Sequence, residues 1–257
     1  MNSSTKQVLV IGDIHGCLDQ LKQLIALAPK GTQVYSVGDI IDRGPNSRGV
    51  IDLVRSTGIQ AVRGNHEEMA TECLPSIREY ILTPTTSLMY KLGGTDWFMN
   101  GGHDVFNQYS ATNDLPQLVV DMEYLQALPL YIETGVVDSD GLELLVSHTW
   151  ESHKIAHASS MTFDFVWSRN QPYAKRNSTK YYNAFGHTPV DYVHKKLYHK
   201  SGATEVHPMP SFYPVGVNLD TGAPYTTKSR GVLSGMLFPS LDILQINQLG
   251  KEDCSYD

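Results

Sequence analysis

Cysteine is scarce in this chain of 257 residues, which contains three, Cys17, Cys73 and Cys254. An odd number of widely separated cysteines argues against a disulfide framework of the kind that staples small secreted domains. Long apolar runs are also missing, and no stretch approaches the roughly 20 residues that a membrane-spanning helix requires. The first six residues lack the apolar core of a signal peptide. We therefore expect a cytoplasmic protein without a membrane partner.

Basic residues are fewer than acidic ones. The chain contains 20 Lys and Arg residues and 27 Asp and Glu residues, for a net charge of −7. A nucleic-acid binder needs a broad positive field to contact phosphates, so this balance argues against a nucleic-acid partner. At this length, with 41% hydrophobic residues, the chain can bury a substantial core. The oligomeric state stays open, and the composition is compatible with a monomer.

Three short apolar runs near the start of the chain each lead into a glycine followed by polar residues. We expect them to form strands at Val8–Ile11, Gln33–Val37 and Ile59–Arg63. Between them, apolar residues at helical spacing predict one helix that ends near Pro29 and a second with Pro45 in its first turn. Strand and helix alternate, which favours a mostly parallel sheet with helices on its faces.

The rest of the chain divides into a helical stretch and a β-rich half. The irregular helical period of residues 67–128 is interpreted as an elaboration of a single domain that spans residues 1–257. Tyr131–Val137 and Leu142–Ser147 flank an Asp-Gly turn, which predicts a hairpin. Further strands are expected at 181–185, 215–219, 231–238 and 241–249, and a surface loop at 202–214.

Polar residues that could bind metal follow the first three strands. Asp39 lies 26 residues after Asp13 and 26 residues before Asn65. One βαβ unit has a similar length of roughly 30 residues, so three neighbouring parallel strands would bring these side chains to one edge of a sheet. Open α/β sheets hold their sites at that edge.

Two histidines later in the chain, His148 and His187, also end apolar runs. With the polar residues of the first three strand ends they form one candidate ligand set: Asp13, His15, Asp39, Asn65, His148 and His187. Mixed imidazole and carboxylate ligands suit Mn, Fe or Zn, and not calcium, which takes oxygen ligands. Two ions about 3.5–4 Å apart would clamp a displacement at phosphorus and generate a hydroxide nucleophile near neutral pH.

The three strand-end motifs resemble the signature motifs of the phosphoprotein phosphatase family of calcineurin-like metallophosphoesterases. These motifs are Gly-Asp-Ile-His-Gly at 12–16, Gly-Asp-Ile-Ile-Asp-Arg-Gly at 38–44 and Gly-Asn-His-Glu at 64–67. His148 and Gly-His-Thr-Pro at 186–189 are similar to the remaining metal motifs of the family. Trp97 with Asn-Gly-Gly at 100–102, and Asn-Leu-Asp-Thr-Gly at 218–222, resemble its compact bacterial and phage branch of serine/threonine protein phosphatases.

The resemblance implies an α/β (α+β) fold, a β-sandwich flanked by helices in four αββα layers. It implies hydrolysis of serine and threonine phosphomonoesters in proteins, with tyrosine as an open alternative, by direct attack of metal-bound hydroxide. The expected partners are phosphorylated proteins or peptides. The expected cofactors are two divalent ions, with Mn ahead of Fe, Zn, Ni, Co or Mg. One branch of the family instead hydrolyses diadenosine tetraphosphate, and a phosphate-sensing scaffold without activity is the non-enzymatic alternative.

Carried onto this chain, the resemblance implies two ligand groups that share one residue. One metal would be held by Asp13, His15 and Asp39, and the other by Asp39, Asn65, His148 and His187. The implied catalytic residues are His66 as general acid, Asp42 as its orienting partner, and Arg43 and Arg169 as phosphate ligands. A carboxylate beside an imidazole fixes its tautomer and favours its protonated form.

Some of these residues have simpler interpretations. Asp42 could instead cap the helix expected near Pro45. Glu67 is expected to be structural, as a cap or ion pair within its loop, and Arg63 to brace the same loop. Residues 225–229 depart from the Gly-Gly continuation that relatives often carry, which weakens any inference about substrate.

Overall fold

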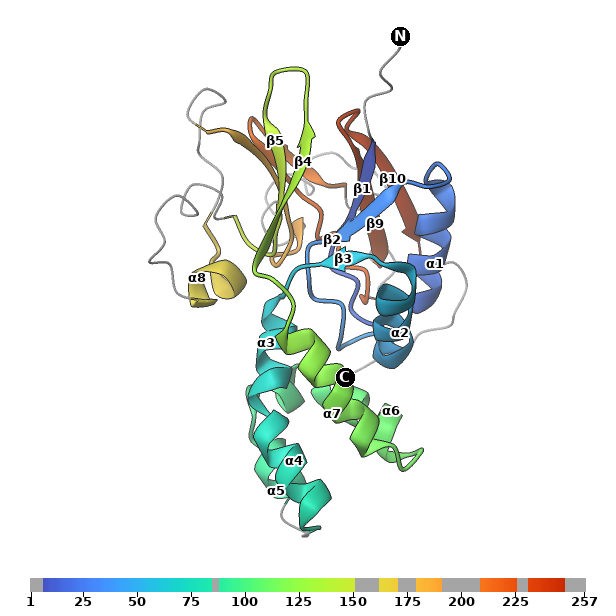
Figure 1. The fold of residues 1–257 in the computed structure, drawn as a ribbon, viewed down its shortest axis with the longest axis vertical. Helices are drawn as coiled ribbons and strands as arrows, with labels where there is room; N and C mark the ends of the chain where they lie inside the picture. The colour runs from blue at the N-terminus through green and yellow to red at the C-terminus, as the bar shows by residue number, and fades with distance from the viewer. Residues whose placement is uncertain are drawn as a thin grey trace, which may run out of the picture.

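The computed structural model describes residues 7–84, 88–150, 162–170, 179–190, 209–225 and 231–247. Two five-stranded sheets pack face to face, with helices beside them (Figure 1). The first sheet has the strand order β10-β9-β1-β2-β3, and the second has the order β4-β5-β6-β8-β7. The predicted sandwich of two sheets flanked by helices is confirmed.

The first sheet combines parallel and antiparallel strands. Its members are β1 (Val8–Ile11), β2 (Gln33–Ser36), β3 (Gln60–Ala61), β9 (Val232–Phe238) and β10 (Asp242–Asn247). The strands β1, β2 and β3 run parallel, as predicted, whereas β9 pairs antiparallel with both β1 and β10. The expectation of a mostly parallel sheet is wrong for β9, which runs opposite to the other four strands, and the short connection from β9 to β10 allows these two strands to pair only as an antiparallel hairpin.

The second sheet is also mixed. It contains β4 (Tyr131–Val137), β5 (Glu143–Ser147), β6 (Tyr181–Phe185), β7 (Ser211–Tyr213) and β8 (Gly216–Asn218). The predicted hairpin is confirmed, since β4 and β5 pair antiparallel, and β5 and β6 run parallel. The loop expected at 202–214 is wrong for β7, which pairs with β8. Residues 202–208 lie outside the described part of the chain.

Alternating side chains of the first strand enter two different cores. Val8 and Val10 lie in the layer between the sheets, whereas Leu9 and Ile11 pack with the helices on the outer face. Those helices are α1 (Leu18–Leu27) and α2 (Ser47–Thr57). Burial on both faces explains why the strand is continuously apolar in sequence.

Helix α2 begins two residues later than Pro45, so the expectation of Pro45 in its first turn is wrong. The side chain of Asn46 caps the helix by accepting a hydrogen bond from the Gly49 N–H at 2.8 Å. Because Asn46 supplies the cap, the alternative role for Asp42 as the cap is also wrong. The N–H of Asp42 instead donates to Oγ of Ser47 at 3.0 Å.

The helices that lie between residues 65 and 126 form a helical arm that extends from the sandwich (Figure 1). It contains α3 (Asn65–Glu72), α4 (Leu74–Leu82), α5 (Leu88–Gly93), the π-helix η1 (Phe98–Gly102), α6 (His103–Ser110) and α7 (Leu115–Gln126). The Asn-Gly-Gly segment at 100–102 marks a kink, because Asn100 and Gly101 have non-helical backbone angles just before α6 begins. Two ion pairs join α2 to the arm, Arg48 with Asp114 and Arg55 with Asp121.

Candidate dinuclear metal site

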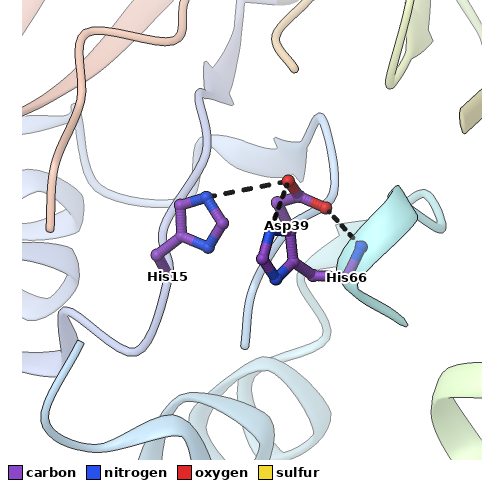
Figure 2. A group of neighbouring side chains, drawn as sticks. All are labelled: His15, Asp39 and His66. Atoms are coloured by element: carbon purple, nitrogen blue, oxygen red, sulfur yellow. Dashed lines mark hydrogen bonds and ion pairs between the residues drawn. The ribbon is translucent and has the colours of Figure 1, made fainter. Parts of the chain in front are cut away.

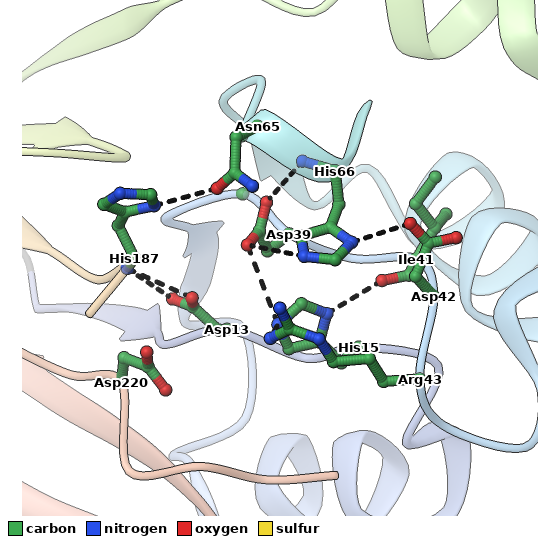
Figure 3. Close-up of polar contacts among 12 residues, drawn as sticks. Asp13, His15, Asp39, Ile41, Asp42, Arg43, Asn65, His66, His187 and Asp220 are labelled. Carbon is green, nitrogen blue, oxygen red and sulfur yellow. Dashed lines mark hydrogen bonds and ion pairs between the residues drawn. The ribbon is translucent and has the colours of Figure 1, made fainter. Parts of the chain in front are cut away.

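The predicted ligands follow strands of both sheets, and Figure 3 shows Asp13, His15, Asp39, Asn65 and His187 close together. Asp13 and Asp39 follow β1 and β2, and Asn65 opens α3 after the short loop that follows β3. From the second sheet, His148 follows β5 and His187 follows β6. The N–H of His187 donates to Oδ2 of Asp13 at 3.1 Å, which joins the two groups of strand ends directly.

Asp39 lies between the two predicted ligand groups. Its Oδ2 atom is 3.6 Å from Nε2 of His15, and its Oδ1 atom is 3.5 Å from Nε2 of His148. The main-chain N–H of His66 donates to Oδ1 of Asp39 at 3.0 Å (Figure 2). The carboxylate is thus held in a position from which each oxygen faces a different imidazole, as a bridging ligand requires.

On one side of Asp39, three predicted ligand atoms converge, one each from Asn65, His148 and His187. Nδ1 of His148 lies 2.9 Å from the Val37 carbonyl, which can only accept, so Nδ1 carries the proton. Nε2 of His148 therefore presents a lone pair to Oδ1 of Asn65 at 3.0 Å. Nδ1 of His187 lies 2.8 Å from the same oxygen. A cation placed among these three atoms would satisfy them all.

The other side of Asp39 has the same arrangement. Nδ1 of His15 donates to the Ile41 carbonyl at 2.9 Å, which leaves the Nε2 lone pair directed toward Asp39. The guanidinium of Arg43 donates to this lone pair at 2.9 Å, so a positive group already lies beside it. The donors on both sides fit a pair of divalent cations.

Burial sets the charges of these ligands. It lowers the pKa of His148 to about 4 and lowers the pKa of His15 well below its ordinary value, so both rings are neutral. Burial also raises the pKa of Asp39 to about 7 and that of Asp13 well above its ordinary value. Neutral imidazoles are the form that binds metal, and a bound cation would stabilise the ionised carboxylates.

Several ligands adopt a backbone conformation that ordinary residues rarely use. The angle φ is positive at five predicted site residues: His15, Asp39, Asp42, Arg43 and His187. Such conformations cost of order 1–3 kcal/mol each and cluster at functional sites. The same turns allow close approach, because a Cβ atom added at Gly186 would lie 1.8 Å from Oδ1 of Asp13.

The predicted pair of His66 and Asp42 is formed, with Nδ1 of His66 2.7 Å from Oδ2 of Asp42. Burial lowers the pKa of His66 and raises the pKa of Asp42. The effect of burial is therefore larger than the stabilisation that the Asp42 carboxylate was expected to give the His66 imidazolium. An imidazolium beside a carboxylate and a neutral ring beside a carboxylic acid contain the same number of protons. Both forms present an N–H at Nε2.

Residues 6–209 match the family model of the calcineurin-like phosphoesterases. The chain belongs to this family. The chain is 33% identical over 201 residues to serine/threonine-protein phosphatase 1 of Salmonella typhimurium, covering 72% of this chain and 80% of that protein. Over 63 residues it is 44% identical to a symmetrical bis(5'-nucleosyl)-tetraphosphatase of Serratia proteamaculans, or 23% of this chain and 22% of that protein. The predicted family is therefore confirmed.

A solved structure shows the same fold. It belongs to a protein proposed to be a diadenosine tetraphosphatase, with a TM-score of 0.58, 18% identity and coverage of 97% of both chains. At that identity the likeness supports the architecture and nothing about substrate. Within the described residues of this phosphoesterase, no helix is long and apolar enough to cross a bilayer.

The two arginines predicted to bind phosphate lie beside different metal ligands of the phosphoesterase. Arg43 is exposed and contacts His15, as described above. Arg169 is also exposed, and its guanidinium donates to Oγ1 of Thr188 at 3.1 Å, next to His187. Of the unusual segment 225–229, only Tyr225 is among the described residues.

The structural roles expected for Glu67 and Arg63 are confirmed. Oε1 and Oε2 of Glu67 accept hydrogen bonds from main-chain N–H groups of the turn after β2 and from that of Gly64. Arg63 forms an ion pair with Glu68 at 3.2 Å, and its N–H donates to the Pro129 carbonyl at 2.8 Å. These contacts hold the loop between β3 and α3.

Sequence reasoning missed two residues of the site. Nε1 of Trp97 donates to Oδ1 of Asp42 at 3.0 Å, although Trp97 belongs to the helical arm. Asp220 is buried near Asp13, and its negative charge raises the pKa of Asp13 further (Figure 3). Both residues lie in motifs that resemble the compact branch of the family, which was the available signal, but the motifs alone assign no contact.

Proposed function

We propose that this phosphoesterase removes phosphate from serine and threonine side chains of proteins, with tyrosine phosphate as a further substrate. The observation that carries the proposal is Asp39 between two sets of metal-type ligands, with the paired His66 and Asp42 beside it. The similarity to the Salmonella protein phosphatase supports the substrate class, since it extends over 80% of that protein.

In this proposal one cation is held by Asp13, His15 and Asp39, and the second by Asp39, Asn65, His148 and His187. Two bound divalent cations, with Mn expected before Fe, Zn, Ni, Co or Mg, neutralise phosphate charge and lower the pKa of water. The enzyme is expected to act in the cytoplasm on phosphorylated proteins or peptides.

The remaining residues position the phosphate and move one proton. The guanidinium groups of Arg43 and Arg169 bind phosphate oxygens, and their planar forks suit that geometry. As hydroxide bonds to phosphorus and the bond from phosphorus to the serine or threonine oxygen breaks, Nε2 of His66 gives its proton to that oxygen, so the products are phosphate and the free hydroxyl. A leaving alkoxide is a strong base, so this transfer is worth roughly 10²–10⁴-fold in rate.

Hydrolysis of dinucleoside polyphosphates is the second candidate. The favouring observation is the 44% identity to the tetraphosphatase, but it covers 63 residues and 22% of that protein. Such a short match also fits two enzymes that share their metal ligands but have different substrate grooves. A phosphate-sensing scaffold is disfavoured, because a binding protein has no use for the proton donor at His66.

The test compares kcat/KM for phosphoserine, phosphothreonine and phosphotyrosine peptides with kcat/KM for diadenosine tetraphosphate, each in the presence of Mn²⁺. We expect the serine and threonine peptides to be hydrolysed at least about tenfold more efficiently than the dinucleotide, a difference of about 1.4 kcal/mol in transition-state binding. A clear preference for diadenosine tetraphosphate would overturn the proposal in favour of the second candidate. Absence of turnover on all substrates would support the scaffold.

A further inference from the structure

We propose that Trp97 is a positioning residue for proton transfer, because its indole N–H holds the carboxylate of Asp42, which in turn holds the imidazole of His66. The inference rests on the proposed function, in which His66 protonates the leaving oxygen. It extends the catalytic apparatus from the sandwich into the helical arm.

The three side chains form a continuous chain of hydrogen bonds. Nε1 of Trp97 donates to Oδ1 of Asp42 at 3.0 Å, and Oδ2 of Asp42 lies 2.7 Å from Nδ1 of His66. All three residues are at most 1% exposed. Each carboxylate oxygen therefore has its own directional partner, which prevents rotation of the carboxylate and of the ring that it holds.

The helical arm lies so close to the turn at Asp42 that a residue with a Cβ atom would not fit at position 101. Gly101, four residues after Trp97, has φ of 112°, and a Cβ atom there would lie 2.7 Å from the main-chain nitrogen of Arg43. A Cβ atom at Gly102 would lie 2.5 Å from the indole ring of Trp97. The kink at Gly101 thus lies against the turn that carries both Asp42 and Arg43, and Trp97 packs against the glycine that follows the kink.

A purely structural role for Trp97 makes a different prediction from a positioning role. A buried tryptophan that only fills the core affects stability and metal content, and its loss lowers the rate for all substrates to a similar extent. A tryptophan that aligns the proton donor affects mainly those substrates whose leaving oxygen needs a proton. Dependence on the leaving group therefore separates the two roles.

The experiment uses Trp97→Phe, which keeps an aromatic ring and removes the N–H donor. The substrates are phenyl phosphate, whose leaving group is poor, and 2,4-dinitrophenyl phosphate, whose leaving group needs no proton. We expect kcat for phenyl phosphate to fall roughly 10–100-fold with little change in KM, and kcat for the dinitrophenyl ester to change less than about threefold. An equal loss on both substrates, or no loss, would overturn the inference.

Trp150→Phe is the matched control, because Trp150 is a buried tryptophan of the core between the sheets. It should leave the ratio of the two rates unchanged. If Trp97→Phe fails to fold, β-(3-benzothienyl)alanine at position 97 replaces only the indole N–H by sulfur. The same leaving-group dependence is expected from it.

The same assay separates this inference from the proposed function. His66→Asn should show the leaving-group dependence more strongly than Trp97→Phe. If His66→Asn shows no such dependence, the general-acid role itself is wrong. If His66→Asn shows the dependence and Trp97→Phe does not, only the role of Trp97 is wrong. A double variant with Asp42→Asn supplies a further check, because Trp97→Phe should add little once the carboxylate is gone.

Discussion

Oε2 of Glu67 accepts a hydrogen bond from the main-chain N–H of Asp39 at 2.8 Å, although the two residues are 28 positions apart. The same oxygen accepts from the Gly64 N–H at 2.8 Å, and Oε1 accepts from the Ile40 N–H at 2.8 Å. One buried carboxylate therefore ties the turn after β2, which carries the predicted bridging ligand, to the first turn of α3.

Glu67→Gln should destabilise the protein, because the amide replaces one accepting oxygen by a donor that faces main-chain N–H groups. We expect the free energy of unfolding in urea to fall by about 1–3 kcal/mol. Glu68→Gln is the matched control, since Glu68 forms a partly exposed ion pair with Arg63 that is worth at most about 1 kcal/mol. Equal losses in the two variants would contradict the assigned role of Glu67.

Asp39→Asn should remove both metal ions rather than one, because each oxygen of Asp39 faces a different ligand group. Elemental analysis of the purified variant, after dialysis against Mn²⁺ and removal of free metal, measures the metal content per chain. Asp140→Asn, at an exposed carboxylate in the turn between β4 and β5, should keep the full content. Retention of either ion by the Asp39 variant would rule out bridging.

His66→Asn should lower kcat for a phosphoserine peptide roughly 10²–10⁴-fold while both metal ions stay bound. The metal measurement is essential here, because Nε2 of His66 lies 4.0 Å from Oδ2 of Asp39 and His66 could itself be a ligand by position. Loss of one metal ion together with activity would show that His66 is a ligand. His103→Asn, on the exposed surface of α6, serves as the control for a histidine replacement.

Asp121→Ala should loosen the helical arm. The side chain of Asp121 is fully buried and accepts hydrogen bonds from Arg55 at 2.8 Å, from the Tyr109 hydroxyl at 2.7 Å and from Gln117 at 2.8 Å. Removing it leaves the buried Tyr109 hydroxyl without its acceptor and breaks the bonds from the more exposed Arg55 and Gln117, so the free energy of unfolding should fall by roughly 1–3 kcal/mol.

Glu123→Ala, on the same helix, removes an exposed ion pair with Arg78 and should cost less than about 1 kcal/mol. Similar urea midpoints for the Asp121 and Glu123 variants would contradict the claim that Asp121 fastens the arm to α2.

Local patterns predicted most of the secondary structure around the site. The strand ends before Asp13 and Asp39 and the hairpin of β4 and β5 follow from apolar runs bounded by glycine, because a strand and its turn depend on neighbouring residues. The errors have local causes too. Pro45 suggested a helix start, but Asn46 offered a side-chain cap one residue later.

Longer-range pairing could not be predicted from those patterns. Strand β9 pairs with β1 although more than 200 residues separate them. That β9 runs antiparallel to β1 depends on the packing of the whole first sheet. Apolar strands that are buried on both faces show no preference for one neighbour over another in their sequence.

The sequence by itself determined the family and the types of side chain available to bind metal, because each motif is a strand, a tight turn and polar residues within a few positions. Only the tertiary structure decided which atoms meet. Packing of the two sheets brings His148 against Asn65 at 3.0 Å, and docking of the arm brings Trp97 against Asp42. Such contacts between distant segments depend on how layers pack, and that information is absent from any local pattern of residues.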